Sequence, residues 1–326
     1  MSTSPDLPPD LRGALDKLSH GVSRNAIGVR AAAQSETYRA GGGSRAITTR
    51  ADALAYAFTR LPATYAAAIS VFDALRDVLP AFAPRTLLDV GAGPGTAAFA
   101  AAEVFAGLEG ISLIDANAAL RDLGLTLMAQ ADSVALRNAD YRHGNALTLM
   151  DGGASADLVV ASYSAGEMPP GELTRFTAAL WAATTGALAV IEPGTPAGYA
   201  RIMAMRTALI GAGAHVAAPC PHDLACPLVA PDWCHFAKRL PRLRDHLRVK
   251  GAVVPFEDEK FSYVVVTRGT PRRIDARVLA PPRTTKSAIT SKLCIGDGLL
   301  VDVAARRDAE AWRQRRSWRW GDDVVR

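Results

Sequence analysis

The stretch Asp89-Val90-Gly91-Ala92-Gly93-Pro94-Gly95 decides the fold. Its first two residues end an apolar run at 86–90 that predicts a strand, and an apolar run at 96–105 that predicts a helix follows it. Glycines between a strand and a helix permit a tight turn and a close approach of the backbone to a ligand. The helix that follows presents unpaired N–H groups at its first turn. The stretch therefore predicts a polar-ligand site on an α/β sheet.

Strand and helix patterns alternate from Arg85 onward, which predicts a mostly parallel sheet. We expect an N-terminal helical region over 1–80, with helix over 49–79 broken at Pro62. A Rossmann-like domain over 81–270 would carry an insertion at 216–251, and a basic extension would fill 271–326. The extension should hold a short β unit near 288–303 and a helix from 304 to about 316. The expected strands are 86–90, 111–115, a weaker one near Tyr141, 157–162, 187–192, 215–218 and 261–267, and the helices between them are 96–105, 116–131, 171–184 and 196–209.

Charge is distributed unevenly along the chain. Residues 235–326 hold 21 Lys and Arg against 11 Asp and Glu, a net of +10, whereas the rest holds 16 against 21, a net of −5. A basic third on an acidic body suggests an anionic partner such as RNA, and a solvated basic surface is the plainer interpretation. No window reaches the roughly 18 apolar residues of a membrane span, and the start of the chain lacks a signal-peptide pattern. We expect a soluble cytoplasmic protein without membrane contact, and a monomer.

The form of the glycine loop indicates which cofactor binds. Asp89 stands two residues before the first of the three glycines, Gly91, Gly93 and Gly95. This DxGxGxG pattern resembles motif I of class I methyltransferases, in which the acid helps to hold the methionine moiety of S-adenosylmethionine. Asp115 ends the second predicted strand, where an acid can accept both ribose hydroxyls. Asn145 stands where that class often places a residue against the adenine, although an ordinary turn residue is an equally good interpretation.

The candidate catalytic residues are Glu167 and Glu192. Glu167 lies in the loop after the fourth predicted strand, which faces the methyl group in class I methyltransferases, and it could act as a general base. That loop has neither the Asn-Pro-Pro-Tyr type of motif nor a cysteine nucleophile. Glu192, at the end of the fifth predicted strand, is a similar candidate. A structural carboxylate is the alternative for both, so the sequence supports the fold better than any reaction.

The four cysteines, Cys220, Cys226, Cys234 and Cys294, form a second candidate site. All lie in Pro- or Gly-containing contexts rather than in core strands, which favours a metal site over unrelated buried thiols. The spacing C-x5-C-x7-C is longer than is usual for zinc, and His222 or His235 could replace a ligand there. A set of four cysteines suits a [4Fe–4S] cluster, with zinc as the alternative. Either centre would tie the insertion to the C-terminal extension.

Several stretches together resemble the Rsm22 family of methyltransferase-like proteins of the small ribosomal subunit. The specific ones are Ala218-Pro219-Cys220-Pro221-His222-Asp223, Asp232-Trp233-Cys234-His235-Phe236 and Phe256-Glu257-Asp258-Glu259-Lys260-Phe261-Ser262-Tyr263. The resemblance covers roughly residues 50–322. It implies a factor that binds the small ribosomal subunit during assembly and contacts its 16S-type rRNA, and a [4Fe–4S] cluster on the four cysteines.

Basic and aromatic residues supply candidate RNA contacts. Two basic groups stand out, one after Cys234 and one in the tail, where tryptophans are interleaved. The first group is Lys238, Arg239, Arg242, Arg244, Arg248 and Lys250, and the second is Arg313, Arg315, Arg316 and Arg319 with Trp312, Trp318 and Trp320.

The sequence and the resemblance together leave three candidate functions. They are a cluster-containing assembly factor that binds S-adenosylmethionine, an active rRNA methyltransferase, and a small-molecule methyltransferase with structural zinc.

Overall fold

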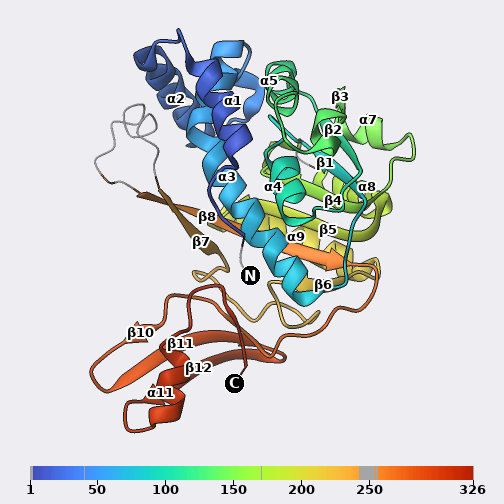
Figure 1. The fold of residues 1–326 in the computed structure, drawn as a ribbon. Coiled ribbons are helices and arrows are strands. Elements are labelled where there is room, and N and C mark those ends of the chain that lie inside the picture. Colours follow the sequence, from blue (N-terminus) through green and yellow to red (C-terminus); the bar gives the residue numbers. More distant parts are fainter. Residues whose placement is uncertain (1–2, 40, 170, 242–253, 255, 326) are drawn as a thin grey trace.

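The structure is a computed structural model, and it describes residues 3–39, 41–169, 171–241, 254 and 256–325 (Figure 1). Its main sheet has eight strands, in the order β3-β2-β1-β4-β5-β8-β6, with β7 paired to β8. Strands β1 to β5 run parallel, and β8 is antiparallel to its neighbours β5 and β6. This is the strand order of a class I methyltransferase-type Rossmann sheet, and the predicted α/β class is confirmed. The strands are β1 (Thr86–Val90), β2 (Gly110–Asp115), β3 (Asp140–His143), β4 (Ala156–Ser162), β5 (Thr184–Pro193), β6 (His215–Ala218), β7 (Phe236–Pro241) and β8 (Phe256–Thr267).

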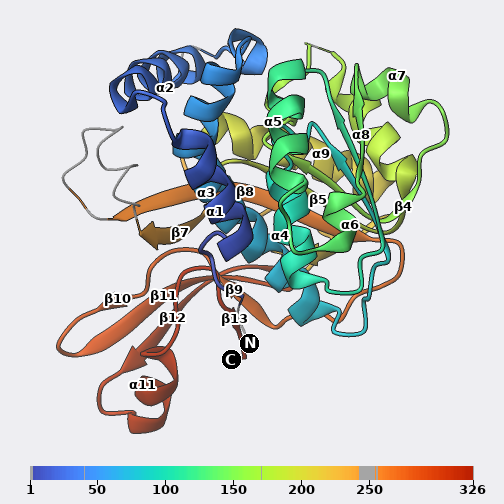
Figure 2. The ribbon, with the colours of Figure 1, turned by 45° about the horizontal axis from the view of Figure 1, so that its top comes forward.

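Helices cover both faces of this sheet, so the body has three layers (Figures 1 and 2). Alternate side chains of each strand point to opposite faces. In β1, Leu87 packs with one set of helices and Leu88 with the other, in two separate hydrophobic clusters. On the first face lie α1 (Pro9–Ser19), α3 (Arg50–Val78), α4 (Thr96–Val104), α5 (Ala118–Met128) and α6 (Val134–Arg137), and on the second α7 (Ala146–Met150), α8 (Leu173–Ala183) and α9 (Pro196–Gly211).

Helix α3 is continuous through Pro62, so the predicted break there is wrong. Proline removes one backbone donor and usually kinks or ends a helix. Here most of the helix is buried on all sides, and packing of this kind outweighs local propensity. Two threonines beside the proline also donate to backbone carbonyls one turn earlier: Thr59 to Ala55 at 2.8 Å and Thr64 to Arg60 at 3.1 Å. Helix α2 (Arg24–Arg39) packs beside α3 at its N-terminal end.

The segment predicted as an irregular insertion contains a strand. Residues 219–235 form a loop, but Phe236–Pro241 is β7 and pairs with the first half of β8. Strand β8 is accordingly five residues longer at its start than predicted, and the two strands form a ribbon at the side of the body (Figure 1). Residues 242–253, including the predicted RNA-contact residues Arg242, Arg244, Arg248 and Lys250, lie outside the described residues.

The C-terminal residues form a second, five-stranded sheet below the body (Figures 1 and 2). The hairpin of β11 and β12 agrees with the expected β unit. The following helix begins at Ala309 rather than at 304, because β12 continues to Ala305. The elements are β9 (Ala276–Val278), β10 (Arg283–Thr284), β11 (Ala288–Ile295), β12 (Gly298–Ala305), α11 (Ala309–Arg315) and β13 (Asp323–Val324). None of the described helices is both long and apolar enough to cross a membrane.

Candidate functional site

The glycine loop turns sharply between β1 and α4. Gly91, Gly93 and Gly95 have φ of 74°, 56° and 80°, the left-handed region in which only glycine is unstrained. At Gly91 a Cβ would lie 2.3 Å from that of Ser164, and at Gly95 it would lie 2.2 Å from the Met128 methyl carbon. The glycine loop is therefore packed between the segment after β4 and the end of α5, and Gly91 and Gly95 have no room for a side chain.

A cavity of about 540 Å³ opens at the carboxyl ends of β1, β2 and β4, next to this loop. Its size suits a nucleoside-type ligand, and its place is where ligands bind to open α/β sheets. Five of the six predicted cofactor residues line it directly: Asp89, Gly91, Gly93, Asp115 and Asn145. The sixth, Gly95, shapes the turn.

Asp89 is the acid at the base of this cavity. Its side chain is completely buried, and its Oδ2 accepts a hydrogen bond from the Ala98 N–H at 3.2 Å. Its Oδ1 is buried and has no partner among the described residues. Burial raises the pKa of Asp89 to about 8, and the negative charge of Asp115 adds to this effect. The free oxygen fits a cationic or hydrogen-bonding group of a ligand, such as the ammonium of the methionine moiety.

Asp115 and Asn117 shape the second side of the cavity, at the end of β2. Asp115 accepts from the N–H of Gly93 at 2.7 Å and from that of Asn117 at 2.6 Å. These bonds fix the carboxylate against the glycine loop, and burial raises its pKa. Asn145 begins α7, where its side chain accepts from the Thr148 N–H at 3.2 Å. Asn145 thus has a capping role, and it faces the cavity as well.

Residues 41–47, which join α2 to α3, cross the cavity as a strap. The Ser44 N–H and Oγ donate to the Glu167 carboxylate at 2.9 and 2.6 Å. On the other side, Asn117 Nδ2 donates to the carbonyls of Ser44 at 2.8 Å and Ile47 at 2.9 Å. A Cβ at Gly43 would lie only 2.8 Å from the Glu167 carboxyl carbon. Glu167 therefore lines the cavity, but both of its carboxylate oxygens accept hydrogen bonds from the strap. Neither Ser44 nor Asn117 was predicted from the sequence as a site residue.

Glu192 lies behind the cavity rather than in it. It is buried, its Oε2 pairs with Arg201 Nε at 2.7 Å, and its Oε1 accepts from the Ala165 N–H at 3.1 Å. Burial raises the pKa of Glu192, and Arg201 opposes that effect. These contacts describe a carboxylate that holds the loop after β4 in place. Neither predicted catalytic residue is free to take a proton from a substrate in this arrangement.

The four cysteines line one small cavity of about 30 Å³. Cys220, Cys226 and Cys234 come from the loop at 219–235. Cys294 is buried within β11 of the second sheet, so the prediction that no cysteine lies in a core strand is wrong for this residue. All four are free thiols. The structure thus brings together, from one loop and one strand of the second sheet, the residues that were predicted as one set. Among the described residues, no group of three or more His, Cys, Asp or Glu is arranged to hold a single metal ion.

Burial raises the pKa of three of these thiols, that of Cys294 to about 12. Each also feels the charge of the neighbouring cysteines, which raises the pKa further. Thiolates, not thiols, bind metals, so a positively charged centre would have to displace these protons. Tyr199 of α9 donates to Cys226 Sγ at 3.2 Å, and the His222 ring lies 3.6 Å from Cys294 Sγ.

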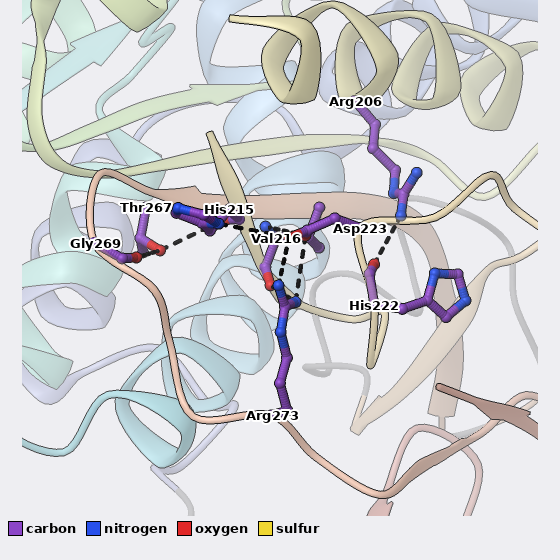
Figure 3. Close-up of polar contacts among 8 residues, drawn as sticks. All are labelled: Arg206, His215, Val216, His222, Asp223, Thr267, Gly269 and Arg273. Carbon is purple, nitrogen blue, oxygen red and sulfur yellow. Dashed lines mark hydrogen bonds and ion pairs between the residues drawn. The ribbon is translucent and has the colours of Figure 1, made fainter. Parts of the chain in front are cut away.

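A polar network holds the cysteine loop between the two sheets (Figure 3). Asp223 accepts from the Val216 N–H of β6 at 2.8 Å and pairs with Arg273, on the segment leading to the second sheet. His215 lies 3.5 Å from the same carboxylate. On the other side, Arg206 of α9 donates to the His222 carbonyl at 2.8 Å (Figure 3). His222 and Asp223 in the cysteine loop are therefore held by β6, by α9 and by the segment that leads to the second sheet.

Exposed cations gather on the second sheet and α11. They are Arg283, Lys286, Arg306, Arg307, Arg313, Arg316 and Arg319, and none has an ion pair within the described part of the chain. By contrast, Arg315 pairs with Asp302 at 3.2 Å, and Arg239 on β7 with Asp258 at 2.7 Å. Trp318 is buried, and Trp320 packs beside His235 and donates to its carbonyl.

The chain is similar to several known proteins. It is 28% identical over 292 residues to the human mitochondrial ribosome assembly protein METTL17, covering 82% of this chain and 61% of that protein. It is 25% identical to a mitochondrial Rsm22-cox11 tandem protein of Schizosaccharomyces pombe, covering 82% of this chain and 42% of that one. The chain thus spans less than two thirds of these relatives.

Solved methyltransferase structures match part of the chain at low identity and low TM-score. One is the magnesium protoporphyrin IX methyltransferase of Synechocystis with bound S-adenosylmethionine, which is 11% identical with a TM-score of 0.41, covering 72% of this chain and 91% of that one. The family model described as mitochondrial small ribosomal subunit Rsm22 matches residues 50–325. This chain is therefore a member of the Rsm22 family.

Proposed function

We propose that this protein binds S-adenosylmethionine, carries a [4Fe–4S] cluster and acts on the small ribosomal subunit through contact with its 16S-type rRNA. The observation that carries the proposal is the convergence of all four cysteines on one cavity between the Rossmann body and the second sheet. The names of the relatives, which describe ribosome assembly and the small subunit, supply the partner.

The cofactor cavity supports the first part of the proposal. The buried and unpartnered oxygen of Asp89 would take the ammonium of the methionine moiety, and Asp115 would take the ribose hydroxyls. Asn145 would lie near the adenine. The strap from 41 to 47 would enclose the ligand and exclude water from it.

The cysteine cavity supports the second part. In a [4Fe–4S] cluster each thiolate binds its own iron, so four cysteines placed around a cavity suit it without meeting at one point. When bound, the cluster would supply an electron-transfer centre or a structural cross-link. This chain's own contribution would be to hold Cys294 of the second sheet against the loop of the Rossmann body. Zinc is the alternative occupant.

The exposed cations of the second sheet and α11 support RNA contact. Guanidinium groups that lack carboxylate partners are available to phosphates. Trp312, which lies under Arg306 at 5.4 Å, would offer a ring for stacking on an unpaired base. A cluster between this surface and the body would fix how the two are oriented.

Two experiments test the proposal. The first is anaerobic purification of wild type and Cys226→Ser, with metal analysis and visible absorption. We expect about four irons per chain, lost in the variant; one zinc and no visible band would contradict the cluster. The second is co-sedimentation with small ribosomal subunits and their precursors. The proposal includes a monomer in the cytoplasm, which light scattering and cell fractionation would check.

An active rRNA methyltransferase is the second candidate, because the cavity with the free Asp89 oxygen is suited to the methyl donor. It predicts methyl transfer to small-subunit rRNA that Asp89→Ala abolishes. The contacts that occupy Glu167 and Glu192 favour a binding role over catalysis. A small-molecule methyltransferase with structural zinc would show no salt-dependent RNA binding.

A further inference from the structure

Two arginines beside the cysteine cavity are buried and lack the partners that buried cations need. Arg206 of α9 is 2% exposed and Arg277 of β9 is 4% exposed, and both line the cavity with the four cysteines. Neither forms an ion pair with a carboxylate in the described part of the chain. A buried charge without a counter-charge strongly destabilises a fold, so an anion is expected nearby.

The contacts of Arg206 leave its charge uncompensated. Tyr199, Ile202, Met203 and Arg206 recur at helical spacing, so one face of α9 is turned toward the cavity. The guanidinium donates to the His222 carbonyl at 2.8 Å and is hydrogen-bonded to the Cys220 side chain, whereas its Nε is buried without a partner among the described residues. Arg206 lines the same cavity as the Cys220 and Cys294 thiols.

Arg277 approaches from the opposite sheet. It lies across from Cys294 in the pairing of β9 with β11, and it donates to the carbonyls of Pro219 at 3.0 Å and Gly321 at 2.7 Å. Asp323, its neighbour in β13, feels the charge of Arg277 more strongly than that of Arg272, although the ion pair of that carboxylate, at 3.6 Å, is with Arg272. Arg277 therefore lines the cavity from the second sheet, together with Cys294.

We infer that Arg206 and Arg277 are the two counter-charges of a thiolate-bound anionic centre in this cavity. The inference rests on the proposed cluster and adds residues that neither the cysteine spacing nor the family match assigns. An oxidised [4Fe–4S] core with four thiolates carries two net negative charges, which the two guanidinium groups balance. One-electron reduction adds a third negative charge, so these cations should stabilise the reduced form most and raise the reduction potential.

The test compares Arg206→Met and Arg277→Met with the charge-preserving Arg206→Lys. Arg273→Met is the matched control, because Arg273 holds the same loop but is paired with Asp223 and does not line the cavity. The readouts on the anaerobically purified full chain are the midpoint potential, followed by electron paramagnetic resonance with dithionite as reductant, and the rate of iron release to a chelator.

We expect both methionine variants to have lower midpoint potentials and to release iron about tenfold faster, with Arg206→Lys closer to wild type and Arg273→Met unchanged. Midpoint potentials equal to wild type in both methionine variants would overturn the inference. If a methionine variant holds no cluster, thermal unfolding of the metal-free proteins distinguishes a counter-charge role of the arginine from a structural role. A metal-free variant as stable as the metal-free wild type supports the counter-charge role, and one that is strongly destabilised indicates a structural role and overturns it.

The outcome for the wild type separates this inference from the proposed function. Wild type without iron contradicts the proposed cluster. If it holds zinc instead, the counter-charge inference is judged by zinc affinity, which Arg206→Met should weaken and Arg273→Met should not. Equal zinc affinity in the two variants would then sink the inference as well.

Discussion

The protonation state of Asp89 should make the proposed ligand binding in the cavity depend on pH. In the proposed complex its unpartnered oxygen would receive the ammonium of the ligand as a carboxylate, whereas burial raises the pKa of Asp89 to about 8. Binding therefore releases a proton at neutral pH. We expect the affinity for S-adenosylhomocysteine to rise by up to about tenfold per pH unit between pH 6 and 7.5. Titration calorimetry measures this, and Asp89→Asn should bind weakly with little pH dependence. A flat wild-type profile would contradict the role given to Asp89.

The stability of the folded protein should fall with rising pH because of the same carboxyl group, whereas ligand affinity should rise. Its folded pKa of about 8 lies above the ordinary value of 3.8, so the folded state holds the proton more tightly than the unfolded state. Its contribution to stability is full below pH 4 and is lost as the pH rises toward 8. Between pH 6 and 8 we expect the unliganded wild type to lose about 2 kcal/mol through this group. Asp89→Asn removes this loss, and denaturant unfolding of the two proteins at both pH values gives the comparison.

At the scale of elements, the strap from 41 to 47 depends on one carboxylate. Glu167 accepts two hydrogen bonds from Ser44, and bonds to a charged acceptor contribute about 1.5–3 kcal/mol each when intact. Glu167→Gln should weaken the strap, so that S-adenosylhomocysteine dissociates about tenfold faster with little change in its association rate. Stopped-flow fluorescence gives both rates. Ser317→Ala, which removes only a local bond to the Gln314 carbonyl, is the control. A dissociation rate like that of wild type would show that the strap does not retain the ligand.

The sequence predicted the Rossmann elements well and the elements around the cavities poorly. Strands β1 and β6 have the predicted bounds, because short apolar runs end there at turn residues. Strand β7 escaped prediction, since only Phe236 and Leu240 of its six residues are buried. The strap was missed because its glycines resemble a flexible linker. The requirement for glycine at Gly43 comes from Glu167, 124 residues away, and no local pattern records such a contact.

The candidate sites divide in the same way. The glycine loop and the cysteine set could be named from residue type and spacing alone. The structural roles of Glu167 and Glu192 could not be predicted from the sequence, because their partners Ser44 and Arg201 become neighbours only after folding. The buried arginines were hidden for a related reason. In the sequence Arg206 and Arg277 look like two of many surface cations, and only the meeting of α9 with the second sheet buries them.

At the scale of the whole molecule, the net charge of the last third should appear as salt-dependent RNA binding. Arg313, Arg316 and Arg319 lie together on and after α11, exposed and without ion pairs among the residues described. Removing one arginine that binds a phosphate should reduce the magnitude of the slope of the log RNA-binding constant against log salt concentration by about one. For the triple substitution to Glu we therefore expect a slope smaller by up to about three and an affinity at least tenfold lower at low salt.

The control for this experiment carries the same change of charge elsewhere on the surface. Arg85, Arg121 and Arg175 are each already paired with a carboxylate: Glu109, Asp122 and Asp151 respectively. Their triple substitution to Glu alters the net charge equally but removes no candidate phosphate-binding group. If binding to small-subunit rRNA, measured by filter retention over a salt series, falls equally in both triple variants, only the overall charge matters. A decrease confined to the α11 variant would identify the second sheet as the RNA-binding surface and explain why the cysteine cavity joins it to the body.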